Sequence, residues 1–190
     1  MFLLVRHGQT DANAQGLLLG RRDPPLSALG HRQAAALARV IPADARIVSS
    51  PLRRALQTAA AFGRQVDVDD RWIELDYGTL DGCRPDEVAG DVWRRWRADP
   101  SFVPGGGESL RSLGERVRAA CEAVVDEAGE REVVIVSHVS PIKAAIAWAL
   151  QVGDEVAWRM FVLDGSIARI RLDSHGPVLL SFNEVPSLDV

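Results

Sequence analysis

Three short apolar runs without polar alternation recur along the chain. They cover residues 2–6, 45–50 and 132–138. Continuous apolar runs of this length are typical of strands that are buried on both faces of a mainly parallel sheet. We therefore expect these three segments to form the centre of such a sheet.

Segments with helical patterns alternate with the apolar runs. They cover residues 27–41, 50–63, 108–129 and 137–150. Ser27, Ser50 and Ser140 are the predicted N-caps of three of these helices, and Pro follows both Ser50 and Ser140 at the predicted first helical position. Gly63 is the predicted end of the second helix. The segment 108–129 carries apolar residues at a spacing of three to four and predicts the longest helix.

This alternation of strands and helices predicts an α/β protein. Right-handed crossovers place helices on both faces of a mostly parallel sheet, which gives a three-layer α/β/α sandwich. Residues 166–174 and 177–185 predict an antiparallel hairpin that adds an antiparallel edge strand to the same sheet. Residues 75–107 are mostly irregular around a short tryptophan-rich helix near 88–96. We expect them to form a small helical cap on a single domain over residues 1–190.

Composition narrows the class of protein. The 190 residues are 47% hydrophobic and 25% charged, which suits one domain with a continuous core. A net charge of −4 with scattered arginines argues against a nucleic-acid partner. The apolar stretch 2–5 is too short for a signal peptide or a membrane span, so we expect a cytoplasmic protein without a membrane partner. Cys83 and Cys121 lack the spacing of a disulfide framework or a thiolate zinc site.

Polar side chains directly follow the predicted strands. Arg6 and His7 end the first run, and His138 ends the third. Because the carboxyl ends of parallel strands meet at one edge of a sheet, we expect the two histidines to face one pocket. Gly8 would let a ligand approach the backbone. The guanidinium group of Arg6 has paired N–H donors that suit phosphate or carboxylate oxygens. The start of the helix after His138 favours the binding of anions. A structural, hydrogen-bonded role is the alternative for either histidine taken alone.

An arginine and a glutamate are further candidates for this pocket. Position alone does not decide whether Arg53 or Arg54 faces the pocket. Glu74 lies among apolar residues that would favour its protonated, acid-donating form, and an exposed loop carboxylate is the alternative.

Two kinds of chemistry fit these residues. In the first, a neutral imidazole attacks phosphorus, the arginines and the second histidine hold the oxygens, and Glu74 protonates the leaving alkoxide before water releases the phosphate. In the second, His7, His138 and a carboxylate bind zinc. The arginines would repel that cation, and no HxxxH spacing is present. We therefore expect phosphoryl transfer with neither a metal nor another cofactor.

The motifs resemble those of the histidine phosphatase superfamily, also called the phosphoglycerate mutase-like family. The matching residues are Arg6, His7, Gly8, Thr10 and Asn13 for RHGxTxxN; Ser50, Leu52, Arg54, Ala55, Thr58 and Ala59 for SxLxRAxxTA; Glu74, Gly78 and Gly82 for ExxxGxxxG; and Ser137 and His138 for SH. The resemblance selects Arg54 over Arg53. It implies that His7 is the phosphorylated nucleophile, that Glu74 is the proton donor, and that Arg6, Arg54 and His138 complete the phosphate pocket.

The resemblance also implies a wider substrate site. A loop that contacts phosphate and substrate would include Asn13, Leu19 and Gly20. The backbone N–H of Val139 would donate a hydrogen bond to the phosphate. In the loop 15–25, Arg21 and Arg22 are candidates to meet a second anionic group. The cap residues Trp93, Arg94 and Trp96 are candidates for substrate contact, and the alternative is that the two tryptophans pack the cap onto the body.

Three departures from the family pattern leave the substrate open. Val139 stands where the family usually has glycine, residues 79–82 lack the tryptophan often found there, and the histidine common near the C-terminus is absent. The interval between Glu74 and His138 is short, whereas mutases carry a longer insertion to keep water from the phosphoenzyme.

We therefore expect a phosphomonoesterase that hydrolyses a small phosphorylated metabolite through a phosphohistidine on His7. The alternatives are mutase-type phosphoryl transfer and a non-catalytic phosphate binder, although the latter would be expected to lose His7 or Glu74. The sequence leaves a homodimer open.

Overall fold

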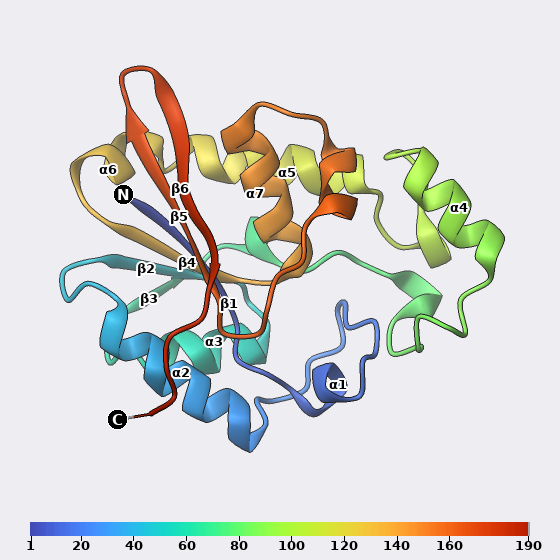
Figure 1. Cartoon of the computed structure of the whole chain (residues 1–190), viewed down its shortest axis with the longest axis horizontal. Coiled ribbons are helices and arrows are strands. Elements are labelled where there is room, and N and C mark those ends of the chain that lie inside the picture. The colour runs from blue at the N-terminus through green and yellow to red at the C-terminus, as the bar shows by residue number, and fades with distance from the viewer. Residues whose placement is uncertain (190) are drawn as a thin grey trace.

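Six strands form one mixed sheet at the centre of the molecule (Figure 1). The computed structural model describes residues 1–189. The strand order is β3-β2-β4-β1-β5-β6. The strands are β1 (Phe2–Arg6), β2 (Arg46–Ser49), β3 (Val66–Val68), β4 (Val133–Ser137), β5 (Ile167–Asp173) and β6 (Gly176–Glu184). The first four in chain order are parallel, and β5 and β6 form the predicted antiparallel hairpin, with β5 paired to β1.

Helices cover both faces of this sheet, with α2 and α3 on one side and α5 and α7 on the other (Figure 1). The α-helices are α1 (Asp11–Ala14), α2 (Ala28–Val40), α3 (Arg53–Ala60), α4 (Gly90–Ala98), α5 (Leu110–Glu122), α6 (Val125–Glu130) and α7 (Val139–Leu150). Alternate side chains of β1 enter two separate cores. Leu3 packs in the core that contains Leu37 of α2, and Leu4 packs in the core that contains Ile142 of α7. The predicted three-layer α/β fold is thus confirmed.

One of the three predicted N-caps agrees with the structure and two differ. Ser27 caps α2 as predicted, because its Oγ accepts a hydrogen bond from the Gly30 N–H at 3.1 Å. Ser50 does not cap α3, whose N-cap is Leu52; its hydroxyl instead lies 2.7 Å from Nε2 of His138. Ser140 lies inside α7, because the helix starts directly after β4 and the extended His138 becomes its N-cap.

The segment predicted as one long helix is divided in two. Helix α5 ends at Glu122 and α6 begins at Val125. Val124 lies between them with φ −116° and ψ 2°, outside the helical range. The break falls at a pair of β-branched valines, which favour the helix less than the alanines before them.

The remaining elements surround the sheet. Short 3₁₀ helices are η1 (Asp70–Trp72), η2 (Gly78–Leu80), η3 (Pro104–Gly106) and η4 (Asp154–Arg159). Helix α4 lies away from the sheet at one end of the molecule (Figure 1). It falls within residues 75–107, whose status as a cap stays a prediction. The strand β3 was not predicted, since its three residues carry no buried side chain.

Three other properties concern the part of the chain that the structure describes. Cys83 and Cys121 are free thiols. No helix within residues 1–189 is long and apolar enough to cross a membrane. The same residues contain no cluster of three His, Cys, Asp or Glu side chains that is suited to hold a metal ion.

Candidate active site

The ends of β1 and β4 bring the two predicted histidines together. Arg6 lies opposite Ser137 in the parallel ladder, and the next N–H along, that of His7, donates to the Ser137 carbonyl at 3.0 Å. The ring centroids of His7 and His138 are therefore only 5.0 Å apart. Both rings are buried. The two histidines face one site, as the strand pattern predicted.

The hydrogen-bond partners define the tautomers of both rings. Nδ1 of His7 lies 2.7 Å from the carbonyl oxygen of Gly8, which can only accept, so Nδ1 carries the proton and Nε2 keeps its lone pair. Nδ1 of His138 accepts from Nε of Arg54 at 3.2 Å, which leaves its Nε2 proton for Ser50. Burial first, and the positive charge of Arg54 second, lowers the pKa of His7 and of His138 well below the usual value. His7 therefore presents a neutral imidazole whose unprotonated Nε2 faces Arg54.

Arg54 is the residue that ties the two rings together. Its Nε lies 3.2 Å from Nε2 of His7 and 3.2 Å from Nδ1 of His138, so one N–H is shared between two acceptors. Its two terminal nitrogens donate to the carbonyl oxygens of Gly20 and Arg22, each at 2.8 Å. The side chain is fully buried, whereas Arg53 is exposed. The geometry thus places Arg54 rather than Arg53 at the site.

Replacement of Arg54 by lysine is expected to lower kcat/KM by about 10²-fold, in line with the loss of one preorganised donor. Lysine keeps the positive charge, but it lacks the planar guanidinium group whose several N–H donors reach both histidine rings and the two backbone carbonyls. The unfolding free energy should also fall by about 1–3 kcal/mol, because buried carbonyls lose their donors. Steady-state kinetics and urea unfolding measure both effects. Arg53→Lys is the matched control, and equal losses in the two variants would contradict the assignment.

A second prediction concerns pH and stability. In the unfolded chain both imidazoles bind protons below about pH 6.5. In the folded protein they stay neutral, so the unfolded state binds more protons and stability falls as the pH drops below that value. The loss should reach at most about 1.4 kcal/mol per pH unit for each histidine. Urea unfolding at pH 7.5 and 5.5 should show a shallower loss for His7→Gln than for the wild type, and an unchanged loss would contradict this explanation.

Gly8 has a packing role as well as a place beside the nucleophile. A Cβ atom at this position would overlap the carbonyl oxygen of Gly30 at the start of α2. The Gly8 N–H donates to Oγ1 of Thr58 at 3.0 Å. The sequence suggested close approach of a ligand, whereas the structure shows close approach of another backbone segment.

Glu74 is a buried carboxyl beside the start of α7. Its side chain is 3% exposed, so it is not an exposed loop carboxylate. Its Oε1 accepts from the N–H of Leu75 at 2.7 Å and from the N–H of Ser140 at 3.2 Å. Because Ser140 belongs to the first turn of α7, the helix N-terminus that follows His138 is directed at this carboxyl. The second histidine and the candidate acid are therefore held by the same helix start.

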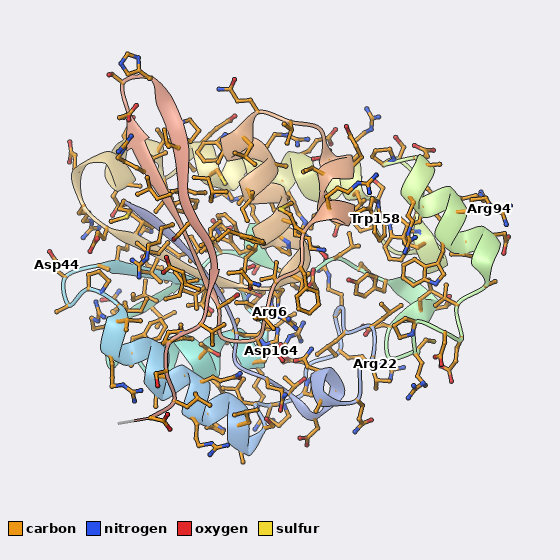
Figure 2. The ribbon with its side chains drawn as sticks, in the orientation of Figure 1. Arg6, Arg22, Asp44, Arg94, Trp158 and Asp164 are labelled. Atoms are coloured by element: carbon orange, nitrogen blue, oxygen red, sulfur yellow. The ribbon has the colours of Figure 1, made fainter. Side chains whose placement is uncertain are left out.

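Arg6 lies at the rim of the site and is held by a residue that the sequence did not reveal. Its Nη1 donates to the Val162 carbonyl at 2.6 Å, and its Nη2 forms an ion pair with Asp164 at 2.6 Å. Figure 2 shows Arg6 and Asp164 adjacent at the centre of the molecule. The Nε of Arg6 is buried and has no partner within residues 1–189. Asp164 lies in the turn before β5 and belongs to none of the sequence motifs described above, so the sequence did not identify it.

Within residues 1–189, neither a hydrogen bond nor an ion pair joins Asn13, Arg21 or Arg94 to either histidine. Oδ1 of Asn13 accepts from the N–H of Thr10 at 3.0 Å and completes the cap of α1. Arg21 lies 3.5 Å from the Glu108 carboxylate. Arg94 is exposed on the outer side of α4 (Figure 2). Leu19 is buried beside Gly20, whose carbonyl holds Arg54. The binding roles predicted for these residues stay predictions.

Two hollows are lined by residues next to the histidines in the chain. The aromatic cavity has a volume of about 110 Å³, and its walls include Leu75, Tyr77, Trp93, Trp96, Trp158 and Lys143. The outer cleft has a volume of about 420 Å³, and its walls include Arg6, Asn13, Val139, Phe161, Asp164 and Lys143. Val139 and Lys143 line both hollows.

Aromatic side chains are present although residues 79–82 lack a tryptophan. Trp93 and Trp96 from α4 meet Trp158 from η4 in the wall of the aromatic cavity. Trp96 is 2% exposed and also packs on Tyr77, with ring centroids 5.7 Å apart. The tryptophans therefore pack α4 onto the body and also line a cavity, and their contact with a substrate stays a prediction.

This fold brings a neutral histidine and the buried arginine Arg54 together at the carboxyl edge of an α/β sheet. The chain belongs to the histidine phosphatase superfamily (branch 1), because the model of that family matches residues 2–185. The predicted family is therefore confirmed.

Three comparisons place the chain within this family. It is 38% identical over 168 residues to the bifunctional protein Rv2228c of Mycobacterium tuberculosis, which covers 83% of this chain and 46% of that protein. The chain thus spans about half the length of the first curated relatives it matches. It is 35% identical over 191 residues to phosphoserine phosphatase 1 of Hydrogenobacter thermophilus, which covers 95% of this chain and 90% of that protein. A phosphoserine phosphatase of Entamoeba histolytica, solved in complex with 3-phosphoglyceric acid, has a TM-score of 0.89 at 27% identity and covers 97% of this chain and 96% of that chain.

Proposed function

We propose that this protein is a phosphomonoesterase that hydrolyses a small phosphorylated metabolite through a phosphohistidine intermediate on His7. The observation that carries the proposal is the neutral, buried His7, whose Nε2 lone pair lies 3.2 Å from the guanidinium of Arg54. The relatives named phosphatases support the same activity. The substrate is an ester of phosphate with an alcohol.

In the first half of the reaction, Nε2 of His7 attacks phosphorus and the bond from phosphorus to the ester oxygen breaks. The Nε–H of Arg54 donates to a phosphoryl oxygen as its charge changes, and Nδ1 of His138 positions that Nε–H. Arg6, held by Asp164, adds positive charge at the rim. Glu74 in its acid form gives its proton to the leaving oxygen, so the alcohol departs neutral.

In the second half, water attacks the phosphohistidine. The carboxylate of Glu74 accepts one proton of this water, and the bond from phosphorus to Nε2 of His7 breaks. Inorganic phosphate leaves and the neutral imidazole is regenerated. The N–H groups of Leu75 and Ser140 hold Glu74 in place for both proton transfers.

Hydrolysis is favoured over mutase-type transfer by the size of the segment between Glu74 and His138. A mutase must exclude water while its intermediate turns over. Here residues 75–107 supply one helix of nine residues, α4, and two short 3₁₀ helices, η2 and η3.

The test is turnover of p-nitrophenyl phosphate by the purified protein between pH 5 and pH 8, with and without EDTA. We expect hydrolysis that EDTA does not change. In a second assay, 3-phosphoglycerate is supplied with 2,3-bisphosphoglycerate, and release of inorganic phosphate is expected to exceed formation of 2-phosphoglycerate. No hydrolysis alongside retained phosphate binding would support the non-catalytic alternative, and dominant isomerisation would support the mutase.

A further inference from the structure

The aromatic cavity lies next to the residues that hold Glu74. Leu75 and Ser140 both line this cavity, and both donate their backbone N–H to the Glu74 carboxyl. An acid that protonates the leaving oxygen must touch it, so the rest of the alcohol extends from Glu74 into adjacent space. At about 110 Å³ the cavity is well above the roughly 10–15 Å³ that one water needs. It therefore has room for an organic group.

The walls of the aromatic cavity suit a flat apolar group. Trp93 and Trp96 stack with ring centroids 5.3 Å apart and an interplanar angle of 12°. Trp158 meets both rings edge-on, with centroids 6.2 Å from Trp93 and 5.3 Å from Trp96. Figure 2 shows Trp158 on the side of the body that faces α4. These packed rings give the cavity a rigid aromatic wall against which another flat group can pack.

Lys143 is the charged side chain of this cavity. It is the single lysine of the chain, and the other 21 basic side chains are arginines. It lies one helical turn after Val139 on α7 and is half-buried between the two hollows. Its ammonium makes neither a hydrogen bond nor an ion pair with residues 1–189, and burial lowers its pKa although the charge of Glu74 acts in the opposite direction. A half-buried cation without a partner gains free energy when an anion arrives.

The other polar groups of the cavity point to the same ligand chemistry. Nε1 of Trp96 is buried and finds no acceptor in the described chain. The residues that line the cavity include no Asp or Glu. The wall of the cavity therefore carries one cation and no carboxylate, and Glu74 is the carboxyl that acts on this cation from beside the cavity.

We propose that the aromatic cavity binds the alcohol half of the substrate, that this half is a flat apolar group bearing a carboxylate, and that Lys143 contacts the carboxylate. This inference rests on the proposed function and names its substrate class. It also implies discrimination against alcohols that carry an ammonium, because Lys143 would repel that charge and no carboxylate lines the cavity.

Three esters with one core test the proposal: phenyl phosphate, 4-(carboxymethyl)phenyl phosphate and 4-(aminomethyl)phenyl phosphate. The methylene group insulates the phenolic oxygen, so the leaving groups are similar. We expect kcat/KM for the carboxymethyl ester to exceed that for phenyl phosphate by about tenfold, as for one charged hydrogen bond. The aminomethyl ester should be the poorest of the three. A carboxymethyl ester no better than the aminomethyl ester would overturn the proposal.

Variants of Lys143 assign the preference to this side chain. In Lys143→Met the ratio of kcat/KM between the carboxymethyl ester and phenyl phosphate should fall towards one, and Lys143→Arg should restore part of it. Arg159→Met removes an exposed cation of η4 and is the matched control, with the wild-type ratio. An unchanged ratio in Lys143→Met would overturn the role of Lys143.

A binding experiment separates this inference from the proposed function. Reductive methylation with carbon-13 formaldehyde keeps the charge of Lys143 and gives it the only labelled side-chain signal of the chain. Titration with the product 4-hydroxyphenylacetate should shift this signal, and 4-hydroxybenzylamine should not. Absence of turnover with all three esters and with p-nitrophenyl phosphate would defeat the proposed function, whereas absence of a shift would defeat the cavity assignment.

Discussion

His7→Ala should lose at least about 10⁴-fold of the phosphatase activity and all acid-labile labelling by radioactive substrate. The reason is that the attacking atom disappears, while Arg54, His138 and Glu74 can only stabilise charge around a nucleophile that is no longer present. Both effects are measurable on p-nitrophenyl phosphate, the first as kcat/KM and the second as phosphate bound to the protein after a quench in alkali.

The matched control is His31→Ala, which removes an exposed histidine of α2. It should keep wild-type turnover and labelling. His7→Ala should still bind inorganic phosphate, because the arginines remain. Acid-labile label that persists in His7→Ala would place the nucleophile elsewhere.

Glu74→Gln should slow the hydrolysis of esters whose leaving group must be protonated more than that of esters whose leaving group departs as an anion. On an alkyl phosphate such as glycerol 3-phosphate, kcat/KM should fall by about 10²- to 10⁴-fold, the usual contribution of a general acid. On p-nitrophenyl phosphate the loss should stay below about tenfold, because nitrophenolate leaves without protonation. The parameter kcat/KM is the right measure, since it reports the steps up to the first irreversible one and not the later hydrolysis of the phosphoenzyme.

Glutamine is a conservative replacement at this position. Its amide oxygen can still accept from the N–H groups of Leu75 and Ser140, so the carboxyl site should stay folded. Glu122→Gln, on the exposed face of α5, is the control and should leave both substrates unaffected. Equal losses on the alkyl and aryl esters would remove Glu74 from the role of proton donor.

The strand pattern predicted the centre of this site because strand ends are fixed by local properties. Apolar runs that end in Arg6, Ser49 and Ser137 stop where the sheet reaches solvent or ligand, and parallel pairing then brings the following residues together. The meeting of His7 with His138 follows from this geometry. The family resemblance added what geometry alone left open, the choice of Arg54 over Arg53.

Other parts of the site depend on tertiary contacts that leave no local signal. The sequence offered Ser50 as a helix cap, and the fold gives its hydroxyl to His138 instead. Asp164 lies far along the chain from Arg6, so their ion pair arises only when β5 pairs with β1. Trp158 likewise meets α4 only through the fold. Such pairings need the full topology, because nothing in the neighbouring residues specifies the partner.

The two carbonyls that hold Arg54 limit how the proposed phosphatase could change its substrate. Loops usually tolerate insertions and deletions, and changes in them often alter substrate specificity. Here the carbonyls of Gly20 and Arg22 are fixed to the same guanidinium that binds both histidines. An insertion or deletion between residues 15 and 25 would therefore disturb catalysis along with recognition. Directed evolution of specificity should accordingly accumulate its changes in α4 and η4, and libraries that randomise the 15–25 loop should yield mostly inactive clones.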